Sequence, residues 1–198
     1  MIDRPETLRR QLLLTCAVGA SGLAHANETR PAVFGLSRIE IVSAGQIRHV
    51  AVYIPSSYRG DRKVPLVLDL HATGITPEVE LQITGMDGAA EREGFIVALP
   101  VAATRLADGR LTWNVPHRDG VDDVAFVAGV LDLLLARFRI DPARVYATGF
   151  SGGARLASVL ACRLADRIAA IGVVGGLQGP DPDREGCSAP RAVPLLAF

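Results

Sequence analysis

A serine flanked by glycines carries the strongest chemical signal in this sequence. Residues 149–153 read Gly-Phe-Ser-Gly-Gly, which matches the pattern G-x-S-x-G with Ser151 at its centre. The pattern is typical of a nucleophilic serine on a tight strand-to-helix turn, where a side chain at a flanking glycine would collide with neighbouring backbone. A strand-like run (144–149) precedes it and an apolar helical run (154–160) follows. Ser151 is therefore predicted to be a catalytic nucleophile.

Two alternatives would give this serine no role as a nucleophile. The first is a glycine-rich turn with a bystander serine. The second is a phosphate-binding loop, which the missing G-K-[S/T] ending and the missing dinucleotide fingerprint disfavour.

A nucleophilic serine needs hydrogen-bond donors for the oxyanion that forms when it attacks a carbonyl. The free N–H groups at a helix start supply one donor, which predicts the backbone N–H of Gly152. The second donor comes from a loop after an earlier central strand. Residues 71–74, His-Ala-Thr-Gly, follow the apolar run 65–70, and the N–H of Thr73 is the predicted donor. We expect His71 to brace this loop at the substrate site; a role as catalytic base is the alternative, disfavoured because His71 precedes the serine.

The elements that must position these groups alternate between strand and helix. Residues 38–42 and 48–54 alternate in polarity and predict an antiparallel pair around Ala44-Gly45. Apolar strands are predicted at 65–70, 95–99, 144–149, 168–174 and 193–198. Helices are predicted before Gly94, after Asp122-Asp123 and after Ser151, and Asp141-Pro142 predicts a one-turn element. The pattern indicates an α/β fold with a mostly parallel sheet and helices on both faces.

The first 26 residues differ from the rest of the chain. Arg9-Arg10 precede a short apolar run, and Ala24-His25-Ala26 offers a signal peptidase site. We expect residues 1–26 to be a signal peptide and residues 27–198 to be one domain, secreted or periplasmic, with no membrane anchor after cleavage. A buried N-terminal helix is the alternative, and the residues do not separate Sec from twin-arginine export.

Export leaves two cysteines, Cys162 and Cys187, in an oxidising compartment. A disulfide between them is predicted; two unpaired thiols are the alternative. The 21 basic and 21 acidic residues balance, which disfavours nucleic acid or an anionic membrane as partner.

With these residues in view, the chain resembles the secreted polyhydroxybutyrate depolymerase and feruloyl esterase-like family of α/β-hydrolases. The resemblance runs from about residue 39 to residue 198. It is carried by PLVLDLH at 65–71, AEREGF at 90–95, TWN at 112–114, VDDV at 121–124 and RVYATGFSGG at 144–153. It implies an α/β-hydrolase fold, hydrolysis of short-chain or aryl esters by a Ser-Asp-His triad, and no metal or cofactor. It also implies that Trp113 lines the substrate pocket, a core position being equally compatible.

Two features depart from that family. Ala72 stands where the family usually has glycine, which predicts a differently placed loop and a weakened oxyanion hole. No histidine follows Ser151, although the triad order in this fold is serine, acid, histidine. We therefore expect the fold to be missing its C-terminal portion, with the triad Asp and His outside these residues. The alternative is a catalytically dead remnant that binds an ester at most; a peptidase is less favoured.

Overall fold

In the computed structural model of this chain, the structure describes residues 34–116, 120–177 and 188–198. The predicted signal peptide therefore lies outside the described residues. No helix among the described residues is long and apolar enough to cross a membrane.

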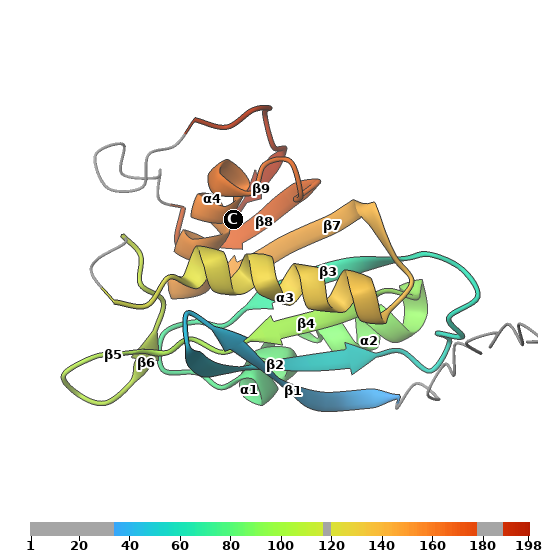
Figure 1. Cartoon of the computed structure of the whole chain (residues 1–198), viewed down its shortest axis with the longest axis horizontal. Coiled ribbons are helices and arrows are strands. Elements are labelled where there is room, and N and C mark those ends of the chain that lie inside the picture. Colours follow the sequence, from blue (N-terminus) through green and yellow to red (C-terminus); the bar gives the residue numbers. More distant parts are fainter. Residues whose placement is uncertain (1–33, 117–119, 178–187) are drawn as a thin grey trace, which may run out of the picture. The chain divides into compact units, whose positions relative to one another are not determined.

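A seven-stranded sheet in the order β1-β2-β4-β3-β7-β8-β9 forms the centre of the described chain (Figure 1). The β1·β2 and β2·β4 pairs are antiparallel, and all later pairs are parallel. This order, with a crossover that places β4 between β2 and β3, puts β3 and β7 side by side, so the loops after both strands meet at one edge. The strands are β1 (Gly35–Ser43), β2 (Gln46–Ile54), β3 (Val64–Leu70), β4 (Ile96–Pro100), β7 (Ile140–Phe150), β8 (Ala170–Val174) and β9 (Leu195–Ala197).

Four helices connect these strands, and their ends follow local sequence signals. Helix α3 (Asp123–Arg137) is capped by Asp122, whose side chain accepts the N–H of Ala125. Gly85, in the left-handed conformation, ends α1 (Pro77–Thr84) and starts α2 (Met86–Glu93). Helix α4 (Gly152–Arg163) begins directly after Ser151.

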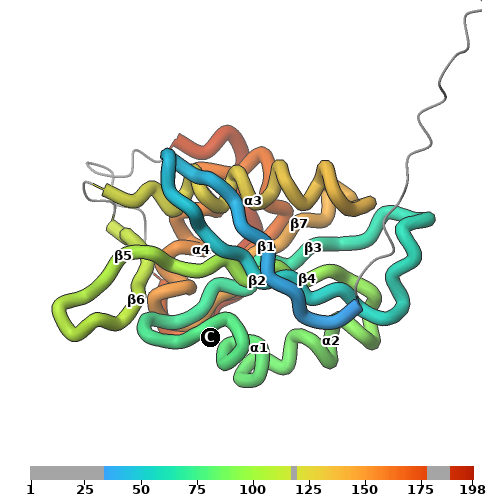
Figure 2. Tube along the Cα trace, turned by 60° about the horizontal axis from the view of Figure 1, so that its bottom comes forward, coloured from blue at the N-terminus to red at the C-terminus, as the bar shows by residue number. Residues whose placement is uncertain are grey.

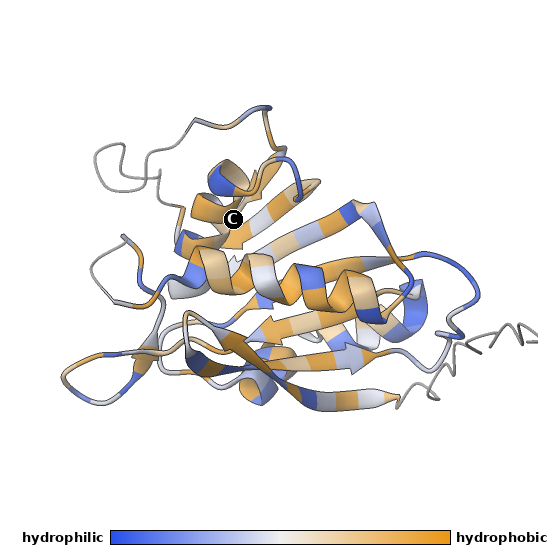
Figure 3. Cartoon of the chain, viewed as in Figure 1, coloured by the Kyte–Doolittle hydropathy of each residue, from blue (hydrophilic) through white to orange (hydrophobic). Residues whose placement is uncertain are grey.

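The strands alternate their side chains between two apolar clusters, one for each face of the sheet. In β4, Ile96 and Ala98 join the larger cluster, which includes buried residues of α3 and α4. Val97 and Leu99 join the smaller cluster with Leu81 of α1. Figure 2 shows α1 and α2 on one side of the strands and α3 on the other, and Figure 3 shows how apolar residues fill the central strands. The prediction of helices on both faces is confirmed.

Three local predictions need correction. The predicted helix before Gly94 is two helices, because Gly85 interrupts it. Asp141-Pro142 is not a separate turn element but part of β7, where the register against β3 shifts between Val64 and Leu66. A small hairpin, β5 (Thr104–Arg105) and β6 (Leu111–Thr112), was not expected. Its strands of two residues are too short to leave a periodic pattern in the sequence.

Candidate functional site

Ser151 lies at the turn between β7 and α4 with a backbone conformation that few residues adopt. Its φ is 51° and its ψ is −108°. Such a conformation costs on the order of 1–3 kcal/mol and persists only where the surroundings enforce it. The backbone N–H of Ser151 donates to the carbonyl of Val174 at 2.9 Å, and its own carbonyl accepts from Arg155 at 3.2 Å. The turn predicted from the glycine-flanked serine is therefore present.

Close backbone contacts explain the glycines of this turn. A Cβ at Gly149 would lie 2.6 Å from the carbonyl oxygen of Gly153. A Cβ at Gly153 would overlap the carbonyl of Leu70, so the first turn of α4 packs directly on the end of β3. Gly176, after β8, packs as closely on the carbonyl oxygen of Ser151. Three segments therefore hold the elbow in place.

The loop after β3 lies against the start of α4. A Cβ placed on Gly152 would be 3.3 Å from the backbone nitrogen of Thr73, so the two predicted oxyanion donors are neighbours. In the described part of the chain, neither N–H has a hydrogen-bond acceptor. The side chain of Thr73 shares a 2.8 Å hydrogen bond with the hydroxyl of Thr112 in β6, which fixes the loop against the hairpin. The arrangement can donate two N–H groups to one oxyanion.

His71 and Trp113 are both buried, with 1% and 3% of their surfaces exposed. The Nδ1 of His71 bonds the carbonyl of Ala72 at 2.8 Å, and its Nε2 accepts the N–H of Ala102 at 3.0 Å. The indole N–H of Trp113 donates to the carbonyl of His71 at 2.8 Å, and the two rings pack at 4.8 Å between centroids. Burial lowers the pKa of His71, so its imidazole is neutral. Both rings brace the oxyanion loop, and contact of either with a substrate stays a prediction.

The Ala72 substitution does not strain the loop. Only Ala44 and Ser151 among the described non-glycine residues have a positive φ. Ala72 therefore adopts ordinary backbone angles, and a loop placed differently from that of the family stays a prediction.

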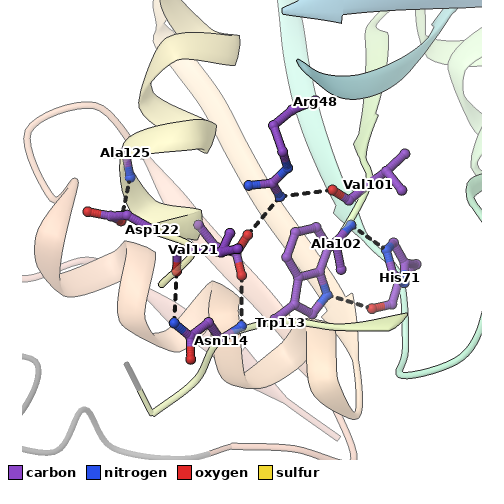
Figure 4. A network of polar contacts seen from close by, with 10 residues as sticks. Arg48, His71, Val101, Ala102, Trp113, Asn114, Val121, Asp122 and Ala125 are labelled. Carbon is purple, nitrogen blue, oxygen red and sulfur yellow. Dashed lines mark hydrogen bonds and ion pairs between the residues drawn. The ribbon is translucent and has the colours of Figure 1, made fainter. Parts of the chain in front are cut away.

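A buried ion pair fixes the two segments whose residues Ala102 and Trp113 hydrogen-bond His71 (Figure 4). The guanidinium of Arg48 contacts a carboxylate oxygen of Asp123 at 2.8 Å and donates to the carbonyl of Val101 at 2.9 Å. The other oxygen of Asp123 accepts the N–H of Asn114 at 2.7 Å. The network therefore ties β2, the start of α3 and the Trp113 segment together.

Two further carboxyl groups are buried on the α1 side of the loop. Glu80 accepts the backbone N–H of Ala72 at 3.1 Å, and Asp69 accepts the hydroxyl of Thr84 at 3.0 Å. Burial raises the pKa of Asp69 to about 7, the nearby Glu80 adding to the rise, and burial also raises the pKa of Glu80. One oxygen of each carboxyl has no hydrogen-bond partner in the described chain.

A cavity of about 310 Å³ lies beside the elbow. Thr73, Thr112 and Trp113 contribute to its wall from one side, and Arg155 contributes from α4. Because Thr73 also contacts Gly152, the cavity adjoins the two candidate donors. Its position is suitable for one part of an ester whose carbonyl lies at Ser151.

Comparison with known proteins identifies the family. A family model described as "Esterase PHB depolymerase" matches residues 48–182, more than half of the chain. The chain belongs to this family. The matched range includes the oxyanion loop (71–74), the segment around Trp113 and the turn that carries Ser151.

The curated relatives that match this chain are named as esterases. A bifunctional acetylxylan esterase/xylanase from Neocallimastix patriciarum is 32% identical over 77% of the chain, which corresponds to 21% of that protein. Feruloyl esterase B from Piromyces equi is 32% identical over 76% of the chain and 28% of its own length. The chain thus spans less than a third of either relative.

Solved structures confirm the predicted α/β-hydrolase fold. A thermostable esterase superposes with a TM-score of 0.64 at 18% identity, covering 82% of this chain and 46% of that one. A ferulic acid esterase superposes with a TM-score of 0.59 at 20% identity, covering 77% and 66%. At these identities the likeness concerns the fold alone.

One predicted site residue lies outside the described part of the chain, and the sequence analysis missed other residues of the site. Cys187 lies outside the described residues, so its disulfide with Cys162, buried on α4, stays a prediction. Among the described residues no cluster of metal-ligating side chains occurs. The sequence indicated Asp122-Asp123 only as the start of a helix, whereas in the structure Asp123 also pairs with Arg48. The buried carboxyls of Asp69 and Glu80 were also missed. The available signal was an acidic residue inside an apolar strand, for Asp69, and inside a short helix, for Glu80.

Proposed function

We propose that the protein is an exported carboxylic ester hydrolase in which Ser151 is the nucleophile and no metal takes part. The observation that carries the proposal is the strained backbone of Ser151 beside two N–H groups without an acceptor in the described chain, those of Gly152 and Thr73. Membership of the Esterase PHB depolymerase family supports the same chemistry.

The proposed reaction has two steps. The hydroxyl oxygen of Ser151 attacks the ester carbonyl, its proton passes to a base, and the N–H groups of Gly152 and Thr73 stabilise the oxyanion. Collapse of this intermediate expels the alcohol, which takes up the proton, and leaves an acyl-serine. Water then attacks the acyl-serine, releases the carboxylic acid and restores the hydroxyl.

The base is proposed to be a histidine other than His71. Both ring nitrogens of His71 are engaged inside the loop, and its lowered pKa disfavours proton uptake. His49 is exposed on β2 and pairs with Glu40 at 3.9 Å. His25 and His117 lie outside the described residues. The resemblance to the family implies that an Asp and a His after the last strand complete the relay.

The substrates are proposed to be short-chain or aryl esters. The named relatives include an acetylxylan esterase and a feruloyl esterase, which differ in the acid that they release. The cavity of about 310 Å³ beside the elbow has room for such groups.

Hydrolysis of p-nitrophenyl butyrate tests this function. We expect turnover that Ser151→Ala lowers by at least about 10³-fold, because the serine and its base act as a unit. Ser158→Ala is the matched control: Ser158 lies on the same helix and its hydroxyl bonds the carbonyl of Ala154. Turnover unaffected by Ser151→Ala would contradict the proposal. Absence of any turnover in a folded chain would favour the ester-binding remnant.

Export and the disulfide are part of the proposal and have separate tests. Cleavage after Ala26 predicts a mature protein that begins at Asn27, which N-terminal sequencing of the secreted or periplasmic form measures. A Cys162–Cys187 disulfide predicts that the mature protein takes up thiol-alkylating reagent only after reduction. An uncleaved product or free thiols would contradict these two statements individually.

A further inference from the structure

One charged side chain enters the cavity beside the elbow. Arg155 lies one helical turn after Ser151 in α4, and its backbone N–H donates to the Ser151 carbonyl at 3.2 Å. Its side chain is exposed and lines the cavity together with Thr73, Thr112 and Trp113. Arg155 therefore lines the same cavity as Thr73, which carries one of the two candidate oxyanion donors.

The charge of Arg155 has no acidic partner in the described part of the chain, unlike that of several other arginines. Arg38, Arg110 and Arg144 pair with carboxylates on the surface, and Arg48 pairs in the core. The other described residues that line the cavity are all uncharged: Thr73, Thr104, Leu106, Thr112, Trp113, Asn114, Val115 and Pro116. Among the described residues, Arg155 is thus the one charged side chain that lines this cavity, and its charge is available to an anion.

The chemistry of the wall favours a carboxylate over other groups. A guanidinium presents a planar fork of N–H donors that matches the two oxygens of a carboxylate. The hydroxyls of Thr73 and Thr112 already bond each other at 2.8 Å, which satisfies part of their hydrogen bonding. Arg155 is therefore the group expected to pair with the carboxylate. The leucine, tryptophan, valine and proline side chains of the wall are suited to the methylene chain between two polar ends.

We propose that Arg155 makes this cavity a subsite for esters that carry a free carboxylate at the end remote from the scissile bond. The ester carbonyl lies at Ser151, and the remote carboxylate pairs with Arg155. The role as a substrate subsite rests on the proposed ester hydrolase function, whereas the preference for a carboxylate in the cavity does not depend on turnover.

Equilibrium binding to the full chain carrying Ser151→Ala, which removes the proposed nucleophile so that the ester probes are not consumed, tests the carboxylate preference without requiring catalysis. The probes are monomethyl adipate, which carries a carboxylate, and methyl hexanoate, a neutral ester with the same number of acyl carbons. We expect monomethyl adipate to bind about 5- to 10-fold more tightly at low ionic strength, and the preference to shrink at high salt. A second pair, 5-acetoxypentanoate and pentyl acetate, places the carboxylate on the alcohol side and identifies which side occupies the cavity.

Arg155→Gln is expected to bring the ratio of the two affinities to about 1, because it removes the charge that distinguishes the carboxylate from the neutral ester. Arg137→Gln, which removes an exposed arginine from the end of α3, is the control for net charge and should change neither affinity. Arg155→Met serves as a second variant that preserves the aliphatic stem, and circular dichroism verifies that each variant is folded.

The outcomes separate the two proposals. Equal binding of both members of both pairs by the chain in which Arg155 is intact, or a preference that persists in both Arg155→Gln and Arg155→Met, would overturn the subsite. A preference that Arg155→Gln abolishes, in a chain whose p-nitrophenyl butyrate turnover is insensitive to Ser151→Ala, supports the subsite and contradicts the serine hydrolase. An active chain with equal affinities retains the hydrolase and loses the subsite.

Discussion

Two groups of buried charged side chains flank the oxyanion loop, and they are built in opposite ways. On the α3 side, Arg48 and Asp123 form an ion pair in which both carboxylate oxygens accept hydrogen bonds. On the α1 side, Asp69 and Glu80 are buried without a cation among the described residues, and each has one oxygen without a partner. The loop between them supplies the proposed donor Thr73.

The difference shows how one loop can be held by two kinds of polar support. The two charges of the ion pair offset each other, so its contribution to stability depends on keeping both members. The two carboxyls have raised pKa values, because burial disfavours their charged form. We therefore expect the support of the loop on the α1 side to depend on pH.

Breaking the ion pair should have the largest effect. Arg48→Met leaves the carboxylate of Asp123 buried without its cation, which should lower the free energy of unfolding by roughly 3–5 kcal/mol. Urea denaturation at pH 7 measures it. Arg38→Met is the matched control on the neighbouring strand, because its ion pair with Glu78 has side chains 67% and 35% exposed and should contribute less than about 1 kcal/mol. Equal losses in the two variants would contradict the contrast.

Removing the carboxyl of Asp69 should change the pH dependence of stability. Because folding raises this pKa from 3.8 to about 7, the folded state keeps a proton that the unfolded chain has lost between those values. The contribution of Asp69 to the free energy of unfolding is full at low pH, falls as the pH rises, and levels off above pH 7. Between pH 5 and pH 8 the wild type should lose on the order of 3 kcal/mol of unfolding free energy through this group.

Asp69→Asn should remove this part of the fall in unfolding free energy with pH, because the amide side chain has the shape of the carboxyl group and does not titrate. Thermal and urea unfolding of both proteins at pH 5 and pH 8 give the comparison, and taking differences cancels other titrating groups. A variant whose stability falls with pH as steeply as the wild type would show that Asp69 is not protonated in the fold.

Changes at Glu80 should have the smallest effect and separate its hydrogen bond from its charge. Glu80→Ala leaves the buried N–H of Ala72 without its acceptor and should cost about 1–3 kcal/mol. Glu80→Gln keeps an acceptor oxygen, so at pH 5 it should lie closer to the wild type than Glu80→Ala does. Chemical denaturation of the three proteins tests this order. Indistinguishable Ala and Gln variants would mean that the bond to Ala72 contributes nothing.

The sequence predicted the sheet well because period-two alternation and glycine stops are local signals. The β1–β2 hairpin, the strand after it and the strand into the elbow were all found, and Gly94 ends α2 as expected. The break at Gly85 and the inclusion of Asp141-Pro142 in β7 were missed, since a short helix and an irregular strand carry little periodicity.

The site was predicted only where the signal was local. The glycines around Ser151 indicated its turn, and the position of residues 71–74 after an apolar strand indicated which loop would meet it. The partnership of Arg48 with Asp123 joins residues 75 positions apart, which spacing in one sequence does not reveal. Arg155 was not singled out from the sequence, and its place in the cavity depends on the hairpin that the sequence did not indicate.

The contacts of the Ser151 turn also set an order of assembly. Its strained backbone is held by the carbonyl of Val174 and by Gly176, both of which follow it in the chain by more than twenty residues. A residue in such a conformation relaxes when its surroundings are absent. During synthesis, therefore, we expect the elbow to reach this conformation only after β8 has been made and has paired with β7. The conformation of the serine then depends on a strand that is synthesised after it.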